Sequence, residues 1–179
     1  MRFVTVCRSL VAPYAAQCAI ISSLPGIREF SAIAILSEIG ADMSQFPSSK
    51  HLCSWAGLAP CNDQSAGKKK SVRISRAGVY LKPLLIQCAL AAIKDKACQY
   101  FRNRYERIKH RRGHKRALIA IARMLLTIIY HCLKNGDFFD PSLCAEDVGL
   151  SSVYSRDADV SRLFNEAKRL GYSLVFSGA

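Results

Sequence analysis

A helical repeat of apolar side chains dominates the second half of the chain. Over residues 115–133 apolar side chains recur at positions 118, 121, 122, 125, 128 and 129, a spacing that puts them on one face of an α-helix. A second helical pattern runs from Gly78 to about His110, with Pro83 tolerated in its first turns. Because two such helices must cover their apolar faces by packing, the sequence predicts a mainly α-helical fold.

Three segments are expected along the chain. Residues 1–23 are predicted to be an N-terminal helical segment, residues 24–141 the main domain, and residues 142–179 a tail with one helix near 159–170. Within the main domain we expect a helix over 28–39 that Gly40 ends, a short helix from Ser48 or Ser49 to about Ala56, and a basic loop over 61–77 with a short ribbon at Val72–Ser75.

Several classes of protein are excluded by the composition. The longest apolar stretches are Pro83–Ile93 and Ala117–Tyr130, both shorter than the ~18–20 residues of a membrane span, so no membrane partner is expected. The eight cysteines contain no C-x-x-C pair and lie mostly in apolar helical pattern, which indicates reduced thiols in a cytoplasmic protein and no metal site. Trp55 is flanked by apolar residues and is expected in the core.

The charge of this chain is concentrated in one stretch. Between Lys68 and Arg123 there are 17 Lys and Arg, opposed by Asp95 and Glu106, which is a net charge of +15 in a chain whose total is +13. A solvated helix face usually mixes both signs. The excess of one sign over 56 residues therefore indicates a surface for a polyanion, which we interpret as DNA.

A turn around Gly26 resembles a helix-hairpin-helix element. Leu24-Pro25-Gly26-Ile27 separates two helical patterns, so the free backbone amides of the second helix could hold a phosphate oxygen. The usual form has a second glycine after the isoleucine, where this chain has Arg28, which could add a phosphate contact or hinder close approach. An ordinary corner between two helices remains the alternative.

The order of several short motifs resembles a known family. Gly57-Leu58-Ala59-Pro60, Gln64–Lys70 and Arg73–Leu81, taken with the Gly26 turn, follow one another as in the C-terminal half of insertion-sequence transposases of the 110 type, also described as bridge-RNA-guided serine recombinases. The resemblance covers about residues 18–175. It implies a DNA transposase in which the serine of this basic loop attacks a DNA phosphodiester and forms a covalent phosphoserine link.

The resemblance also implies site residues and partners. Ser65 stands at the position of the family's serine, although Ala66 follows it where members often have glycine; Ser71 and Ser75 are rivals by residue type alone. In the family a ribonuclease-H-type N-terminal domain holds the metal ions and a structured RNA guides target choice. Because 23 residues cannot hold such a domain, we expect a truncated or split transposase that binds no cofactor by itself, Mg²⁺ entering only with that domain, and a homo-oligomer.

The predicted DNA-binding residues come from the turn, the loop and the second helical hairpin. The aromatic residues Tyr80, Tyr100, Phe101 and Tyr105 could stack on bases or form a core stripe, and His110 and His114 are interpreted as phosphate contacts. A non-catalytic nucleic-acid-binding remnant or regulator, or an RNA-binding scaffold, would share the same charge pattern. The predicted DNA contacts are Gly26, Arg28, Lys68, Lys69, Lys70, Arg73, Arg76, Arg111, Arg112, Lys115 and Arg116.

Overall fold

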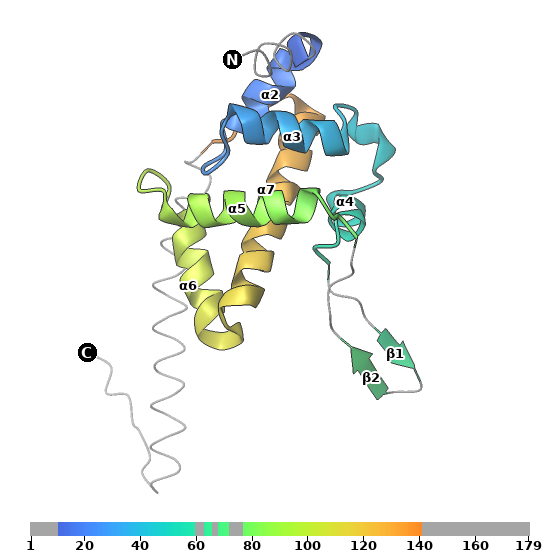
Figure 1. The fold of residues 1–179 in the computed structure, drawn as a ribbon, viewed down its shortest axis with the longest axis vertical. Coiled ribbons are helices and arrows are strands. Elements are labelled where there is room, and N and C mark those ends of the chain that lie inside the picture. The colour runs from blue at the N-terminus through green and yellow to red at the C-terminus, as the bar shows by residue number, and fades with distance from the viewer. Residues whose placement is uncertain (1–10, 60–62, 66–67, 72–76, 141–179) are drawn as a thin grey trace, which may run out of the picture. The chain divides into compact units, whose positions relative to one another are not determined.

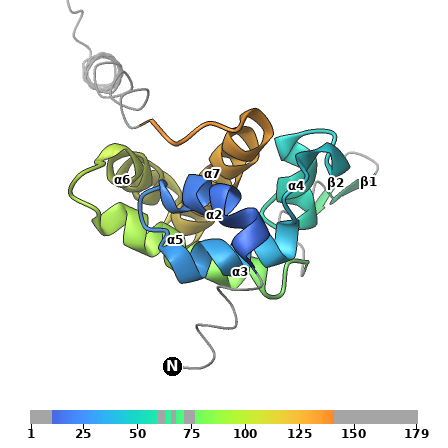
Figure 2. The ribbon, with the colours of Figure 1, turned by 90° about the horizontal axis from the view of Figure 1, so that it is seen from above.

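One long helix, α7 (His114–Asn135), organises the fold of the computed structural model (Figure 1). The structure describes residues 11–59, 63–65, 68–71 and 77–140. Helices α2, α4, α5 and α6 all pack against α7, with α4 and α6 on opposite flanks in both views (Figures 1 and 2). The prediction of a mainly helical fold is confirmed.

The apolar repeat explains why α7 is central. Of the predicted positions, Leu118, Ile121, Ala122, Leu125 and Ile129 are buried, and Ile128 is partly buried. Gly136 ends the helix in the left-handed conformation at φ 78°, which glycine adopts without strain. Within the described part of the chain, α7 is the one helix long and apolar enough to cross a membrane. Half of its most apolar stretch of 18 residues is buried inside this protein. Its apolar character is thus accounted for by the core.

The single helix expected over 78–110 is wrong: the structure has two helices there, α5 (Leu81–Lys94) and α6 (Tyr100–Arg112). Asp95 leaves the helix with ψ 126°, and its carboxylate accepts a hydrogen bond from the Ala97 amide at 2.9 Å. This local bond competes with helical continuation. The break lets both helices pack on α7, while Pro83 lies in the first turn of α5 as expected.

The N-terminal helices contribute to the same core. A short 3₁₀ turn (Ala12–Tyr14) leads into α2 (Ala15–Ser22), and α3 (Glu29–Ile39) follows after the turn. Cys18 and Ile21 of α2 are buried in the core together with Ile35 of α3, so the described part of the predicted segment 1–23 belongs to the core of the main domain. Gly40 ends α3 as predicted, donating its amide to the Leu36 carbonyl at 2.8 Å.

Helix α4 (Ser49–Trp55) begins where the sequence predicted, after Ser48. It is preceded by a 3₁₀ turn (Met43–Gln45) whose Ser44 amide and hydroxyl both donate to the Asp42 carboxylate at 2.8 Å. These bonds hold the pKa of Asp42 below its usual value. Trp55 is not in the core, contrary to the sequence prediction, because 47% of it is exposed.

A short antiparallel ribbon lies between α4 and α5 in the chain. Strand β1 (Asp63–Ser65) pairs with β2 (Lys68–Ser71), and the register skips Lys70 at a bulge. The sequence predicted a ribbon at Val72–Ser75, which falls outside the described residues; β2 ends just before it, at Ser71. The tail helix predicted near 159–170 also falls outside the described residues.

The described cysteines are free thiols inside the apolar core. Burial raises the pKa of the Cys18, Cys88 and Cys132 thiols above its ordinary value, because a charged thiolate is poorly solvated there. Such thiols are protonated and slow to react near neutral pH. The described members of this group are Cys18, Cys53, Cys88, Cys98 and Cys132.

Candidate nucleic-acid interface

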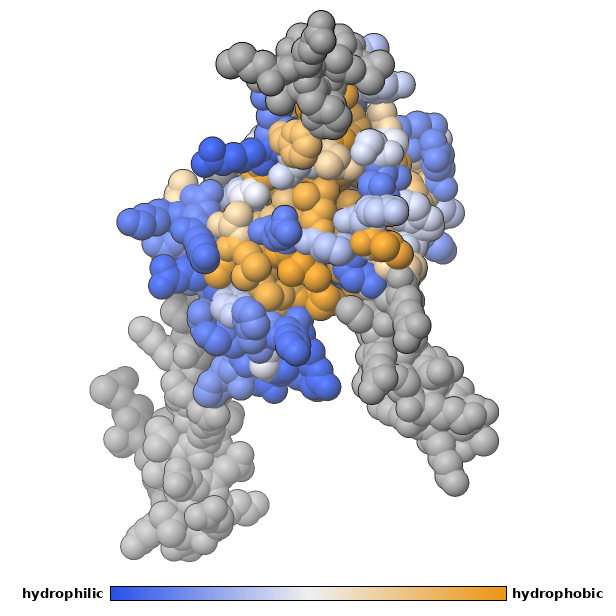
Figure 3. All heavy atoms as spheres, in the orientation of Figure 1, coloured by the Kyte–Doolittle hydropathy of each residue, from blue (hydrophilic) through white to orange (hydrophobic). Residues whose placement is uncertain are grey.

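The corner where α6 meets α7 collects exposed cationic side chains. Four predicted DNA contacts lie here, two at the end of α6 and two in the first turn of α7, and Gly113 makes the turn between the helices at φ 83°. In Figure 3 hydrophilic side chains gather at this lower end of the hairpin, beneath an apolar surface over α5. We call this surface the basic corner; its exposed residues are Arg107, Lys109, His110, Arg111, Arg112, Lys115 and Arg116.

The charges of the basic corner are placed unfavourably for the protein alone. Cations at the C-terminal end of α6 complement the helix dipole, but Lys115 and Arg116 stand at the positive end of α7, whose first turn holds no acidic residue. Glu106 is paired with Lys109 at 3.3 Å. The corner therefore carries mutual repulsion that an anionic ligand would relieve.

A hydrogen bond between two aromatic side chains ties α6 to α7 at this corner. The Tyr105 hydroxyl lies 2.6 Å from His114 Nδ1, and the two rings meet edge to face with centroids 5.9 Å apart. Tyr105 is buried, and the Lys109 ammonium lies 5.4 Å from its ring centroid. His114 thus positions the corner through Tyr105, and both His110 and His114 are exposed. The predicted phosphate contacts of both histidines stay predictions.

The sequence-predicted aromatic residues divide into two groups. Phe101 and Tyr105 are buried and Tyr100 packs beside Phe101 with ring centroids 5.3 Å apart, so these three belong to the core stripe. Tyr80 is 76% exposed. Among the predicted aromatics, Tyr80 alone has its surface open to a ligand.

The Gly26 turn is shaped by contact with α5. Gly26 has φ 79°, and a Cβ there would overlap the backbone nitrogen of Ala92 and lie 2.5 Å from the Cys88 carbonyl oxygen. Glycine is thus required for close packing between the turn and α5. Arg28 is exposed at the N-cap of α3, next to Glu29 in the first turn. The phosphate-binding role of Gly26 and Arg28 stays a prediction.

Ser65 lies at the end of β1, directly opposite Lys68 in the register of the ribbon. Gln64 is opposite Lys69, so the backbone pairing brings the predicted serine and the lysine run Lys68–Lys70 to one end of the hairpin. Directly opposed residues in an antiparallel pair have Cβ atoms about 4.5–5.5 Å apart. Arg73 and Arg76 fall outside the described residues.

The predicted residues thus form three groups in the described structure. The largest is at the basic corner, the second follows the ribbon, and the third is Arg28 with the Gly26 turn. Sequence reasoning missed the exposed Trp55. Its helical neighbours give no clear signal, because His51 four residues earlier is exposed and Leu52 three residues earlier is buried.

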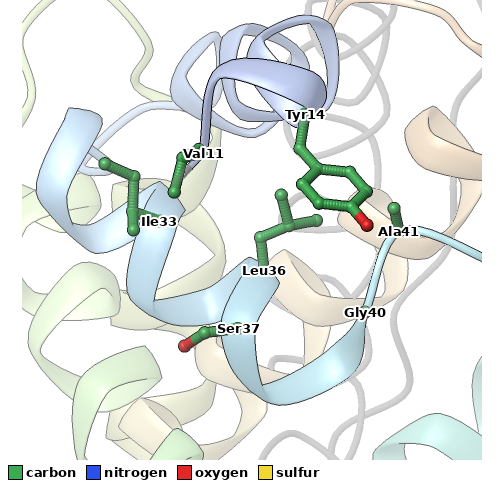
Figure 4. A pocket seen from close by; sticks show the side chains of 7 residues that line it. All are labelled: Val11, Tyr14, Ile33, Leu36, Ser37, Gly40 and Ala41. Carbon is green, nitrogen blue, oxygen red and sulfur yellow. The ribbon is translucent and has the colours of Figure 1, made fainter. Parts of the chain in front are cut away.

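A pocket beside the first turns of the chain differs in chemistry from these groups. It has a volume of about 280 Å³ and is lined by Val11, Ile33, Leu36 and neighbours from α3 (Figure 4). Its two hydroxyls are those of Tyr14 and Ser37, and Ser37 donates to the Ala34 carbonyl at 2.9 Å. None of the described residues that line this pocket is a cation, so this lining does not suit a phosphate. Within the described ranges, no three His, Cys, Asp or Glu side chains gather as a metal site.

Comparison with known proteins identifies the family of this chain. Residues 18–106 match the domain described as the transposase IS116/IS110/IS902 family. The chain belongs to this transposase family. The match includes the Gly26 turn, the ribbon with Ser65 and α6 as far as Glu106, so the basic corner lies beyond it. It confirms the resemblance inferred from the motif order.

Curated proteins of insertion elements are similar to this family member. An insertion element IS110 protein of 43.6 kDa from Streptomyces coelicolor is 30% identical over 129 residues, which is 70% of this chain and 31% of the relative. The transposase for insertion sequence element IS1111A of Coxiella burnetii is 32% identical, covering 65% of this chain and 33% of the relative. The pilin gene-inverting protein of Moraxella bovis is 33% identical, covering 69% and 39%. The chain spans about a third of the length of these relatives.

Proposed function

We propose that this chain is the DNA-binding, serine-bearing part of a transposase that takes part in DNA transposition and recombination. The observation that carries the proposal is the basic corner, where exposed cations of two helices converge and the nearby acid, Glu106, is already paired. Such a surface holds a phosphate backbone without reading its sequence. The family membership supports DNA as the polyanion.

Ser65 is the proposed nucleophile. Its hydroxyl oxygen attacks the phosphorus of a DNA phosphodiester, the bond to one deoxyribose oxygen breaks, and that oxygen leaves with a proton while the serine proton passes to a base or solvent. The register opposite Lys68 supports this role, because a cation there would stabilise the charge that develops on the phosphoryl oxygens.

The remaining partners belong to the same proposal. Mg²⁺ and a structured guide RNA are expected to act with the ribonuclease-H-type domain of longer family members, and this chain is proposed to work with that domain in a homo-oligomer in the cytoplasm. The proposal takes no chemical step through a metal on this chain. The Gly26 turn is proposed as a helix-hairpin-helix-like backbone contact through the amides at the start of α3.

The decisive experiment looks for a covalent protein–DNA adduct. The chain is supplied with the ribonuclease-H-type domain of a longer relative, its guide RNA, Mg²⁺ and labelled DNA, and the adduct is read on a denaturing gel. We expect the adduct to form, to disappear in Ser65→Ala and to remain in the matched control Ser71→Ala. An adduct that survives Ser65→Ala would move the nucleophile elsewhere, and DNA binding without any adduct would leave a non-catalytic nucleic-acid-binding protein.

DNA binding itself is tested by its salt dependence. If about eight phosphates are neutralised, the logarithm of the association constant should fall against the logarithm of salt concentration with a slope near −7. Replacing Lys68, Lys69 and Lys70 by Gln should reduce that slope equally for unrelated DNA sequences, because phosphate contacts carry no base information. A slope near zero in the unaltered chain would contradict the polyanion argument.

A further inference from the structure

Two glycines bring the ends of the ribbon segment into direct backbone contact. A Cβ on Gly57 would overlap the Ala77 carbonyl oxygen, and a Cβ on Gly78 would overlap the Ala56 carbonyl oxygen. Both glycines have positive φ, 67° and 68°. The chain therefore leaves α4 and returns to α5 through one closed crossing, which we call the glycine neck (Ala56, Gly57, Ala77 and Gly78).

Two exposed aromatic side chains flank the glycine neck. Trp55 directly precedes Ala56 and is 47% exposed, and Tyr80 follows Gly78 by two residues and is 76% exposed. One part of the Trp55 ring packs on Phe46, with ring centroids 5.9 Å apart and planes at 58°. The indole is thus held from within the protein while about half of its surface stays open.

Cationic side chains of described residues lie on the elements that join the neck. The Lys82 side chain crosses Gly57, with its ammonium 2.8 Å from the position a Cβ would take there. Lys50 and His51 are exposed on α4, whose sequence contains no acidic residue. A ligand with flat apolar faces and negative charge would complement the exposed rings and the positive charge of these side chains.

We propose that Trp55 and Tyr80 form a stacking site for unpaired bases of a DNA strand, with Lys82 and Lys50 beside the strand's phosphates. Every base has a π-face, so aromatic stacking tolerates any sequence, and the cations supply the contacts to the backbone. This inference rests on the proposed DNA-binding function. It adds a base-stacking site next to the ribbon that carries Ser65, where strand exchange would require bases to be unpaired.

The chain contains a built-in probe of this site, because Trp55 is its only tryptophan. The full chain is titrated with a fluorescein-labelled oligothymidine and with an abasic oligomer of the same length, which has the same phosphates and no bases. Anisotropy reports binding and indole fluorescence reports stacking on Trp55. We expect about tenfold tighter binding of the oligothymidine, the loss that one stacked base represents, and quenching of Trp55 by this ligand but not by the abasic one.

Variants separate stacking from folding. Trp55→Ala should bind oligothymidine about tenfold more weakly and the abasic oligomer unchanged, Trp55→Phe should recover most of the difference, and Tyr80→Ala should show a similar but smaller loss. Tyr14→Ala is the matched control, since Tyr14 is 48% exposed and lines the pocket of Figure 4, whose described lining residues include no cation. Its affinity for both oligomers should not change.

The outcomes distinguish this inference from the proposed function. Equal affinity for both oligomers, or unquenched Trp55 on binding, overturns the stacking site while DNA binding stands. Absence of binding to either oligomer and to duplex DNA overturns the proposed function and the stacking site together. If oligouridine binds ten times more tightly than oligothymidine, the assignment of the stacking site to DNA is wrong and its ligand is RNA.

Discussion

The two ends of helix α7 serve different purposes. Its first turn, His114–Arg116, is exposed and cationic, whereas nine residues from Ala117 to Cys132 are buried. The buried part packs with α2, α4, α5 and α6 and stabilises the fold, while Lys115 and Arg116 in the first turn add charge repulsion beside the bond from His114 to Tyr105. This contrast shows that one continuous helix can join a stabilising core to a surface whose like charges repel one another until an anionic partner neutralises them.

The largest effect is expected from the buried part of α7. Leu125 is fully buried, so Leu125→Ala should lower the free energy of unfolding by about 2–5 kcal/mol through lost burial and a residual cavity. Chemical denaturation measures it. At low denaturant, where the variant is folded, the salt dependence of DNA binding should be unchanged. A changed slope would show that the two ends of α7 are not independent.

The first turn should show the opposite behaviour. Replacing Arg111, Arg112, Lys115 and Arg116 together by Gln should weaken DNA binding and reduce the magnitude of the salt slope by about 3–4, since each phosphate contact contributes about 0.9. The free energy of unfolding should stay nearly the same, because removing cations from the positive end of α7 offsets the loss of Arg111 and Arg112 from the C-terminal end of α6. Substantial destabilisation of the free protein would contradict our view of the corner as a surface for a partner.

Comparing two glycines separates the effect of close packing on stability from the effect of backbone conformation. Gly26 and Gly136 have φ of 79° and 78°, but only Gly26 is pressed against another helix; nothing lies within 4 Å of a Cβ at Gly136. Gly26→Ala should cost about 2–4 kcal/mol from positive φ and overpacking together, and Gly136→Ala about 1 kcal/mol from positive φ alone. Thermal or chemical unfolding compares them. Equal losses would mean that α5 does not constrain the Gly26 turn.

The smallest effect is expected at the bond that joins the two regions. Tyr105→Phe keeps the buried ring and removes the hydroxyl bonded to His114, so it should cost about 1 kcal/mol of stability. DNA affinity should fall modestly as the corner loosens, with the salt slope nearly unchanged because no cation is lost. Phe101→Leu, a core change on the same helix, is the control for general loosening of α6. A salt slope reduced by several units in Tyr105→Phe would contradict this expectation and show that the bond to His114 holds the cations of the corner in place.

Much of the helical fold could be predicted from local pattern. The spacing of apolar residues identified α7 and α3, and Ser48 and Gly40 marked a helix start and a helix end, because periodicity and capping are local properties. The break at Asp95 escaped prediction, since neither glycine nor proline marks it and the stop depends on a side-chain bond to Ala97. The candidate DNA contacts at the corner were predictable because charge is visible in sequence.

The amino-acid sequence by itself determined the helical character, the excess of positive charge and the membership in the transposase family. Periodicity, composition and motif order are properties of the chain that do not depend on how it packs. The tertiary structure alone decided that Trp55 is exposed, that Gly26 is pressed on α5, and that Gly57 and Gly78 close a neck. Each of these depends on contacts between segments far apart in the chain. Exposure and close approach are properties of such packing, and no local pattern encodes them.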